Sequence, residues 1–309
     1  MKKKLLLGIG NIYHETNYLG LETKREDRLS VGHEYRSDRY QVGLGGSVVN
    51  FLVQVKNLGM EVGLVGKIGE DEAGEKVTKL LKKESISTEF IVKSEKCQTS
   101  IDSGLVLKHS GDNIQVVSGN ANQTFKLSDI NLNSDIFDQV KSIYLGGFFK
   151  QESLYRDYPK LVKELYKKGI KIFFDHGRLP VNVSKDKLQI LLEILPFVEG
   201  YFQNRKEIVD ITGVSDIDKA VKVALKLGPK FVAVKLGKDG SMAYSKIENI
   251  YSKGHKVKVL NVVGAGDSFN AAFITHYLSG SSLQKCSDFA NKVASIKVSK
   301  NIFPNLSQI

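Results

Sequence analysis

Residues 261–273, with the sequence NVVGAGDSFNAAF, contain the residue types best suited to chemistry. Gly264, Ala265 and Gly266 carry no bulky side chains, so their backbone N–H groups can approach a ligand closely. The apolar residues that follow Ser268 have helical spacing, which places the three small residues at a helix N-terminus. Free N–H groups and the helix dipole favour an anion there. The segment therefore predicts a binding site for phosphate or a similar anion.

Asp267 follows these small residues directly, and its negative charge would repel a phosphate that was only bound. The aspartate is explained if it takes a proton from a hydroxyl that attacks phosphorus, while the N–H groups hold the transferring phosphoryl group. The alternative is that Asp267 only stabilises the first turn of its helix. Spacing alone leaves both interpretations open.

A second glycine-rich segment lies at residues 43–50, with the sequence GLGGSVVN. Gly45 and Gly46 would let the backbone approach a ligand at a helix start, and the Asn50 amide can both donate to and accept from a hydroxyl. The same residues also fit a tight turn with Asn50 bonded in the core. The segment alone identifies no ligand, and neither the dinucleotide fingerprint nor the P-loop is present in the chain.

The elements that must position these residues alternate along the chain. Short apolar runs suited to buried strands are separated by amphipathic stretches with helical spacing. This pattern predicts an α/β domain with a mostly parallel central sheet and helices on both faces. The expected strands are residues 5–7, 62–65, 143–145, 170–174, 231–234 and 256–260, and the expected helices are residues 48–59, 158–169, 216–228 and a stretch from 268 onward.

Two regions interrupt the alternation. Residues 16–42 are polar with little helical pattern, and residues 97–118 alternate between apolar and polar like half-exposed strands. We expect these regions to form a small sheet that stands off the main domain as a lid over the site. The chain has no repeats, low-complexity tracts or linker, so we predict a single domain over residues 1–309 that carries this lid.

Composition argues against several classes of protein. The chain of 309 residues is 41% hydrophobic and 26% charged, as is ordinary for a soluble globular protein, and no apolar run is long enough to span a membrane. Two distant cysteines, without CxxC or HxxxH patterns, argue against disulfides and metal clusters and suit a reducing cytoplasm. The net charge of +11 comes from scattered lysines without a basic aromatic motif, so nucleic acid is not an expected partner.

Five motifs, taken in order, resemble those of the ribokinase-like, or PfkB, carbohydrate kinases. Residues 45–50 (GGSVVN) are similar to the family's GGxxxN, and residues 66–74 (GKIGEDEAG) to its GxxGxDxxG. Residues 204–207 (NRKE) match NxxE, residues 235–240 (KLGKDG) match the strand-ending xLGxxG, and residues 263–269 (VGAGDSF) resemble the DTxGAGDxF signature. The resemblance covers nearly the whole chain. It implies a ribokinase-like three-layer sandwich with a β-lid, and ATP-dependent phosphorylation of a hydroxymethyl group on a sugar or sugar-like acceptor.

The resemblance also implies a role for each matching residue. Asp267 would be the general base, and the three small residues before it the anion hole. Glu207 would hold Mg²⁺ through water beside the ATP triphosphate. The residues beside the nucleotide would be Asn204, Lys235, Leu236, Gly237, Gly240 and Asn291. The residues facing the acceptor would be Asn11, Gly45, Gly46 and Asn50.

Two departures affect the acceptor side. The family's first strand usually runs Gly-x-x-x-x-Asp, in which the Asp grips acceptor hydroxyls. Depending on which glycine is counted, that position here is Glu15 or Tyr13, and we prefer Glu15 because it keeps a carboxylate. Residues 174–178 (FDHGR) partly resemble an Asp-x-Asn-x-Arg stretch of fructokinase-like members, in which the Arg approaches substrate or phosphate. Arg178 is therefore a candidate for substrate binding, although an ordinary surface arginine after a strand fits equally well.

A third departure concerns a monovalent cation. The signature's opening Asp is Asn261 in this chain. In members activated by a monovalent cation, that Asp helps bind potassium or caesium together with carbonyls from a later glycine-containing segment. The corresponding residues 298–302 (VSKNI) lack the glycine and contain Lys300. We therefore expect an activity that does not need potassium.

Two alternatives remain open. One is a nucleoside kinase, because residues 8–11 (GIGN) and the GGSxxN form also resemble adenosine-kinase-like members; Tyr13, Tyr18 or Phe125 would then stack on a base. The other is a non-catalytic sugar- or nucleotide-binding regulatory protein, suggested by the altered signature and first strand, although the retained Asp267 argues against it. The resemblance also implies that exposed lid edges can pair two chains into a homodimer, although the sequence alone does not fix the oligomer.

Overall fold

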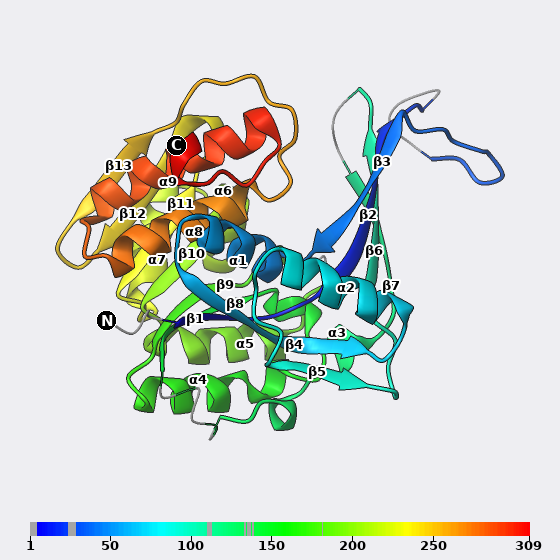
Figure 1. Cartoon of the computed structure of the whole chain (residues 1–309). Coiled ribbons are helices and arrows are strands. Elements are labelled where there is room, and N and C mark those ends of the chain that lie inside the picture. The colour runs from blue at the N-terminus through cyan, green and yellow to red at the C-terminus, as the bar shows by residue number, and fades with distance from the viewer. Residues whose placement is uncertain are drawn as a thin grey trace.

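A nine-stranded sheet forms the centre of the computed structural model, which describes residues 5–23, 29–109, 113–132, 134, 137, 139–180 and 182–309. Its strands are β1 (Leu5–Ile9), β4 (Glu61–Gly69), β5 (Ile91–Ser94), β8 (Val140–Gly146), β9 (Lys171–Asp175), β10 (Gly200–Asn204), β11 (Phe231–Lys235), β12 (Gly240–Ser245) and β13 (Asn249–Lys253). They lie in the order β13-β12-β11-β10-β9-β8-β1-β4-β5 (Figure 1). All pairs from β11 to β5 are parallel, and β12 and β13 add an antiparallel edge.

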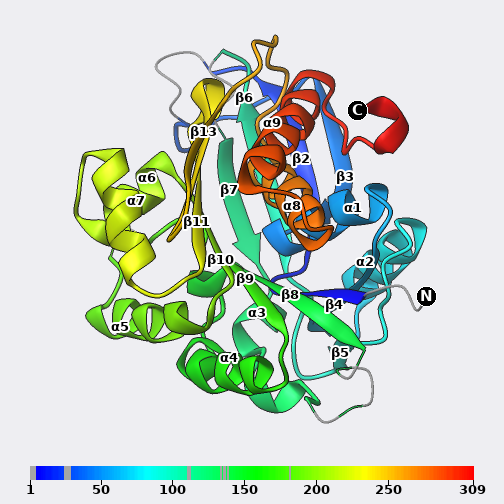
Figure 2. The ribbon, with the colours of Figure 1, turned by 90° about the vertical axis from the view of Figure 1, so that its left-hand side faces the viewer.

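Helices cover both faces of this sheet (Figure 2). One face carries α1 (Ser47–Asn57), α2 (Glu72–Lys83), α8 (Ala265–Leu278) and α9 (Leu283–Lys300); the other carries α4 (Tyr158–Lys167), α5 (Lys185–Ile194), α6 (Arg205–Thr212) and α7 (Ile217–Lys226), and the short α3 is Ala121–Thr124. Side chains alternate between the faces, so Leu6 packs in one apolar layer and Leu7 in the other. The predicted three-layer α/β architecture is confirmed. None of the described helices is long and apolar enough to cross a bilayer.

Most of the expected elements are present. Strands β1, β4, β8, β9 and β11 and helices α1, α4, α7 and α8 occupy the expected stretches. The strand expected at residues 256–260 is wrong, because this segment does not pair with the sheet edge at β13. It lies against α9 instead, where the Leu260 N–H donates to the Val298 carbonyl at 2.8 Å. Val257 and Val259 are 40% and 55% exposed, so their alternation with lysines does not reflect burial in a sheet.

A second, four-stranded sheet stands off the main one (Figure 1). It consists of β2 (Tyr13–Leu21), β3 (Arg39–Gly45), β6 (Ile101–Leu107) and β7 (Asn113–Ser118), in the order β3-β2-β6-β7. Its strands come from the two regions expected to form a lid, of which residues 24–28 and 110–112 lie outside the described residues.

The register of the small sheet gives its two faces different chemistry. Glu15 pairs with Asp102, so their side chains share a face, and Gln115 two places along donates to Asp102 on that same face. The opposite face carries the exposed side chains of Tyr18, Tyr40, Val42 and Val116.

Candidate active site

A cleft of about 920 Å³ lies at the carboxyl ends of β9, β10 and β11 and reaches the start of α8. Its size is within the usual range for a small-molecule site. Residues far apart in the sequence meet in it. Among the predicted site residues, those that line it are Asn204, Glu207, Lys235, Gly237, Gly240, Ala265, Gly266, Asp267 and Asn291.

The start of α8 is built to receive an anion. Gly264 precedes the helix with φ at 78°, a conformation that favours glycine. A Cβ atom there would lie 3.2 Å from a Phe303 ring carbon and 3.3 Å from Lys297 Cε, so a larger residue would also be crowded. In the described part of the chain, no side chain caps this helix N-terminus. The Ala265 N–H already donates to the Val262 carbonyl at 3.1 Å, so the predicted anion hole is left with the N–H groups of Gly264 and Gly266 for a ligand.

Asp267 lies in the first turn of α8 and lines the cleft. Its Oδ2 accepts a hydrogen bond from Asn50 Nδ2 at 3.0 Å. Burial raises the pKa of Asp267 to about 7; Asp175 adds to the rise, while Asn50, Lys235 and Lys297 oppose it. A carboxyl group with a pKa near neutrality can take up and release a proton under working conditions. As the acidic residue in the first turn of α8, Asp267 also fits the structural interpretation, so its position on the helix does not separate the two.

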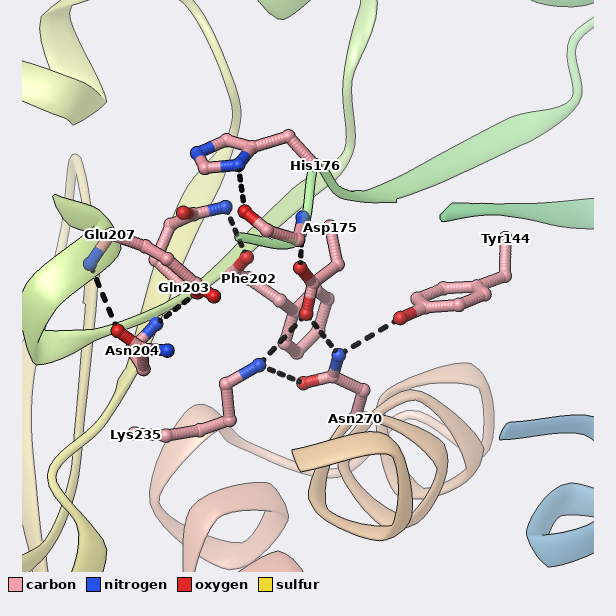
Figure 3. A network of polar contacts seen from close by, with 10 residues as sticks. Tyr144, Asp175, His176, Phe202, Gln203, Asn204, Glu207, Lys235 and Asn270 are labelled. Atoms are coloured by element: carbon pink, nitrogen blue, oxygen red, sulfur yellow. Dashed lines mark hydrogen bonds and ion pairs between the residues drawn. The ribbon is translucent and has the colours of Figure 1, made fainter. Parts of the chain in front are cut away.

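A buried polar network lies directly beside this helix start (Figure 3). Lys235, at the end of β11, points toward Asp175, at the end of β9, with Nζ 2.8 Å from Oδ2. Asn270 on α8 joins them: its Oδ1 accepts from Lys235 at 3.2 Å, and its Nδ2 donates to Asp175 at 2.7 Å and to the Tyr144 hydroxyl at 3.0 Å. The network ties two parallel strands to the helix that carries Asp267.

The charges of this network reach the anion-binding loop. Burial alone would raise the pKa of Asp175, but the charge and hydrogen bond of Lys235 hold it below its ordinary value. Burial would likewise lower the pKa of Lys235, but Asp175 and Glu207 raise it. A Cβ atom on Gly266 would lie 3.6 Å from Lys235 Nζ, so a fixed ammonium group stands next to the loop. Such a cation attracts phosphate oxygens.

Asn204 and Glu207 form a capping box at the start of α6. The Glu207 N–H donates to Asn204 Oδ1 at 2.9 Å, and Glu207 Oε2 accepts from the Asn204 N–H at 2.8 Å. Burial, followed by the charge of Asp175, raises the pKa of Glu207. Arg178 is exposed, and its charge opposes that rise.

Glu207 fits the expected role toward Mg²⁺. Among the described residues, no three His, Cys, Asp or Glu side chains are grouped to hold a metal ion on their own. A single carboxylate in a cleft suits Mg²⁺, which keeps several waters and takes its other ligands from substrate phosphates.

Of the remaining residues predicted to lie beside the nucleotide, some line the cleft and one does not. Gly237 and Gly240 border the cleft, whereas Leu236 is absent from its walls and packs against the apolar layer under α7. Asn291 lines the cleft, and its Nδ2 donates to the Ser252 carbonyl at 3.1 Å and to the Ser252 hydroxyl at 2.9 Å.

The predicted acceptor residues lie outside the cleft walls named above; Asn50 is bonded to Asp267, and the charge of Asp267 acts on Glu15. Asn11 is 4% exposed. Its amide lies close enough to the Tyr13 hydroxyl to oppose the rise of that group's pKa, but neither polar atom makes a hydrogen bond of normal geometry among the described residues. Gly46 has φ at 106°, and a Cβ there would lie 2.4 Å from the Asn11 carbonyl oxygen, which requires glycine. A Cβ on Gly45 would lie 3.0 Å from the Glu15 side chain. Burial, with Asp102 next, raises the pKa of Glu15 to about 7.

Asp102 belongs to the same group of residues and was not predicted from the sequence. It is 3% exposed, its Oδ2 accepts from Gln115 Nε2 at 3.2 Å, and its Oδ1 has no partner among the described residues. Burial raises its pKa, while Lys150 opposes the rise. Unpartnered buried polar atoms are costly, so those of Asn11 and Asp102 indicate a polar ligand.

Comparison with known proteins agrees with this geometry. The family model "pfkB family carbohydrate kinase" matches residues 11–302. The chain belongs to this family. A 5-dehydro-2-deoxygluconokinase from Clostridium perfringens is 29% identical over 268 residues, which cover 84% of this chain and 79% of the relative. This protein is thus a carbohydrate kinase, a phosphotransferase with an alcohol group as acceptor.

Solved structures confirm the ribokinase-like fold of this kinase. Arabidopsis thaliana ribokinase complexed with ribose and ATP superposes with a TM-score of 0.78 at 22% identity, covering 100% of this chain and 96% of that one. A putative ribokinase II from E. coli in complex with ATP and Mg²⁺ has a TM-score of 0.78 at 21% identity, covering 95% and 92%.

Two of the three aromatic residues considered for a nucleoside kinase lie away from the predicted acceptor residues. Phe125 is buried in the apolar layer that contains Leu7. Tyr18 lies near Tyr40 on the exposed face of the small sheet, with ring centroids 6.5 Å apart. Tyr13 is buried beside the acceptor residues: burial, with the charge of Asp102 next, raises its pKa to about 12.

Proposed function

We propose that this kinase transfers the γ-phosphate of ATP to a hydroxymethyl group of a sugar or sugar-like molecule, with Asp267 as general base. The observation that carries the proposal is the position of Asp267. It stands in the first turn of α8, next to the N–H groups suited to a phosphoryl group, and it is hydrogen-bonded to Asn50, one of the residues expected to face the acceptor. A base must lie within reach of both reactants, and this location meets that requirement.

The chemistry follows from this arrangement. The acceptor hydroxyl gives its proton to the Asp267 carboxylate as its oxygen bonds to the γ-phosphorus, and the bond to the bridging oxygen of ADP breaks. The N–H groups of Gly264 and Gly266, together with the ammonium of Lys235, stabilise negative charge on the moving phosphoryl group, whereas the Ala265 N–H is bonded to the Val262 carbonyl. Asp267 then releases its proton to solvent. Asn50, which donates to Asp267, orients the carboxylate.

ATP and Mg²⁺ are the proposed cosubstrate and metal. The support is the ribokinase-like relatives solved with them, together with the cleft that Glu207 and Lys235 line here. Bound Mg²⁺ neutralises charge on the triphosphate. Glu207 would hold it through water, and Asn204 keeps Glu207 in place through the capping box.

We also propose that activity does not depend on potassium. Asn261 occupies the signature's acidic position, and both ends of its amide are already bonded: Oδ1 accepts from the Val263 N–H at 2.9 Å, and Nδ2 donates to Asn301 Oδ1 at 3.1 Å. Lys300, which we expected to weaken cation binding, is exposed at the end of α9. Initial rates in equal concentrations of potassium and sodium chloride should agree, and strong stimulation by potassium would refute independence.

The small sheet is the proposed lid, and its exposed face is the proposed homodimer contact. The support is the clustering of Tyr18, Tyr40, Val42 and Val116 on one face, with the polar Glu15 on the other. Sedimentation equilibrium should give twice the chain mass. The variant Tyr40→Lys should shift the mass toward the monomer, and a wild-type monomer at all concentrations would contradict the contact.

A phosphoryl-transfer assay with a panel of acceptors would identify the acceptor. ADP release should be measured with a panel of sugars, sugar acids including 5-dehydro-2-deoxygluconate, and nucleosides, with Asp267→Asn as the control for contaminating ATPases. We expect turnover with at least one sugar or sugar acid and loss of that turnover in the variant. Turnover on nucleosides alone would favour the nucleoside kinase. Absence of turnover on all acceptors, with ligand binding insensitive to Asp267→Asn, would favour the binding protein.

A further inference from the structure

Lys297, on α9, is a buried lysine without an ion-pair partner. Only 4% of it is exposed, its Nζ donates to Asn301 Oδ1 at 3.2 Å, and it lies 4.9 Å from the centre of the Phe303 ring. No carboxylate in the described part of the chain forms a salt bridge with it. Burial lowers the pKa of Lys297, and the charges of Asp267 and Glu15 oppose this through space and favour the ammonium form. Burying an ammonium group without a counter-ion disfavours folding, so this lysine needs another explanation.

The surroundings of Lys297 connect it to the anion-binding loop. A Cβ on Gly264 would lie 3.3 Å from Lys297 Cε, so the aliphatic part of the lysine packs directly against the loop. Asn301 Oδ1, which accepts from Lys297, also accepts from Asn261 Nδ2 at 3.1 Å. Asn261 Oδ1 in turn accepts from the Val263 N–H at 2.9 Å. A chain of hydrogen bonds thus joins the ammonium group to the residues that lead into the loop.

The two buried lysines of the site therefore differ. Lys235 is paired with Asp175 at 2.8 Å, whereas Lys297 has no ion-pair partner among the described residues and lies behind the N–H groups of the loop. A cation in such a low-dielectric position adds to the positive potential at the helix start. That is the side of the loop on which an anion must be held.

We propose that Lys297 is a positioning residue that acts as a built-in cation: through Asn301 and Asn261 it fixes the Gly264–Gly266 loop in its anion-binding form, and it keeps Asp267 ionised. The inference rests on the proposed function of that loop. In this role the buried charge of Lys297 contributes to anion binding, which a purely structural lysine would not do.

The charge of Lys297 should appear in the titration of Asp267. The groups that act on Asp267 are Asn50 on α1, Asp175 on β9, Lys235 on β11, Lys297 on α9, Glu15 on β2 and Tyr144 on β8. Of these, Lys235 and Lys297 supply the positive charge that lowers the pKa of Asp267. Removing the charge of Lys297 should therefore raise this pKa and move the acid limb of kcat/KM to higher pH.

The test compares Lys297→Met with Lys300→Met, which removes an exposed lysine from the same helix. The measurements are the melting temperature, kcat/KM against pH, and binding of a non-hydrolysable ATP analogue with Mg²⁺ by calorimetry. For Lys297→Met we expect a melting temperature equal to or above that of the wild type. We expect kcat/KM to fall about tenfold. We also expect weaker analogue binding and an acid limb at higher pH. Lys300→Met should match the wild type.

A second variant tests whether an ammonium group with N–H donors is needed at this place. In Lys297→Ala, added methylammonium should restore part of the lost kcat/KM, while tetramethylammonium, which has no N–H donor, should not. The inference is overturned if Lys297→Met equals the wild type in rate and analogue affinity. It is also overturned if the variant melts at a lower temperature and loses rate with the acid limb unmoved. If the wild type transfers phosphate to no acceptor, the proposed function fails, and analogue affinity alone then decides the role of Lys297.

Discussion

The phosphate side and the acceptor side of the site differ in how their polar groups are satisfied. On the phosphate side, Lys235 is bonded to Asp175 and Asn270, and Asn204 and Glu207 bond each other. On the acceptor side, polar atoms of Asn11 and Asp102 have no partner among the described residues. Unpartnered buried atoms also occur on the phosphate side, at His176, Gln203 and Ser268, but none of these three residues is proposed to contact a ligand.

This difference indicates two kinds of preparation for a ligand. The charged side chains of the phosphate side are already held in place by hydrogen bonds, so they need to move little when a ligand binds. The acceptor side leaves buried polar atoms to be satisfied by the ligand, which makes recognition depend on a hydroxyl pattern. The first side would be shared by many kinases of this fold, whereas the second would select the acceptor.

The largest expected effect is that of Asp267→Asn. The amide oxygen can still accept from Asn50 but cannot take a proton, so kcat should fall about a thousandfold, with ATP and acceptor binding within about threefold of the wild type. Loss of binding in step with loss of rate would contradict a role confined to chemistry.

The same variant should change stability with a definite pH dependence. Burial raises the folded-state pKa of Asp267 to about 7, above its ordinary value of 3.8. The wild type is therefore stabilised by the proton at low pH and loses that stabilisation as pH rises through 7. Asp267→Asn should melt above the wild type at pH 8, and the difference should shrink as the pH falls toward 4. A difference independent of pH would contradict the raised pKa.

The next largest effect concerns Lys235. Lys235→Met leaves Asp175 as a buried charge without its partner, which should cost about 3–5 kcal/mol of folding free energy and reduce kcat/KM about a hundredfold. The double variant with Asp175→Asn should recover most of the stability measured by urea unfolding. It should not recover the rate, because the cation beside the loop is still missing. Recovery of both would reduce Lys235 to a structural role.

The smallest expected effect is on the acceptor side. Asp102→Asn should raise the KM of the acceptor about tenfold, because a charged acceptor of hydrogen bonds is lost, and leave the KM of ATP unchanged. The matched control is Asp38→Asn, an exposed aspartate beyond the opposite end of the small sheet. Equal changes in both KM values would contradict the separation of the two sides.

The phosphate side was largely predictable from the sequence because its function depends on local motifs. A run of small residues before a helix, or Asn and Glu three residues apart, specifies backbone geometry within one turn. Gly264 and Asp267 accordingly lie at the start of α8, and Asn204 and Glu207 at the start of α6, as the local patterns predict. The error at residues 256–260 has the same origin, since local alternation cannot tell whether a partner strand exists.

The acceptor side and Lys297 were not predictable in this way. Asp102 acquires its position only through the pairing of β6 with β2, and a shift of one residue would turn it to the other face. In the sequence, Lys297 is indistinguishable from the other scattered lysines. Only the packing of α9 against the loop that contains Gly264 sets it apart. Both depend on contacts between distant segments, which composition and spacing do not encode.

The dependence of kcat/KM on pH tests the central claim, that an ionised Asp267 takes the proton, most directly. The profile should fall about tenfold per pH unit below about pH 7. Glu15 also has a pKa of about 7, so the same profile must be measured for Glu15→Gln. We expect an acid limb near pH 7 that is still present in Glu15→Gln. A wild-type profile that stays flat down to pH 5, or a limb that disappears with Glu15, would contradict it.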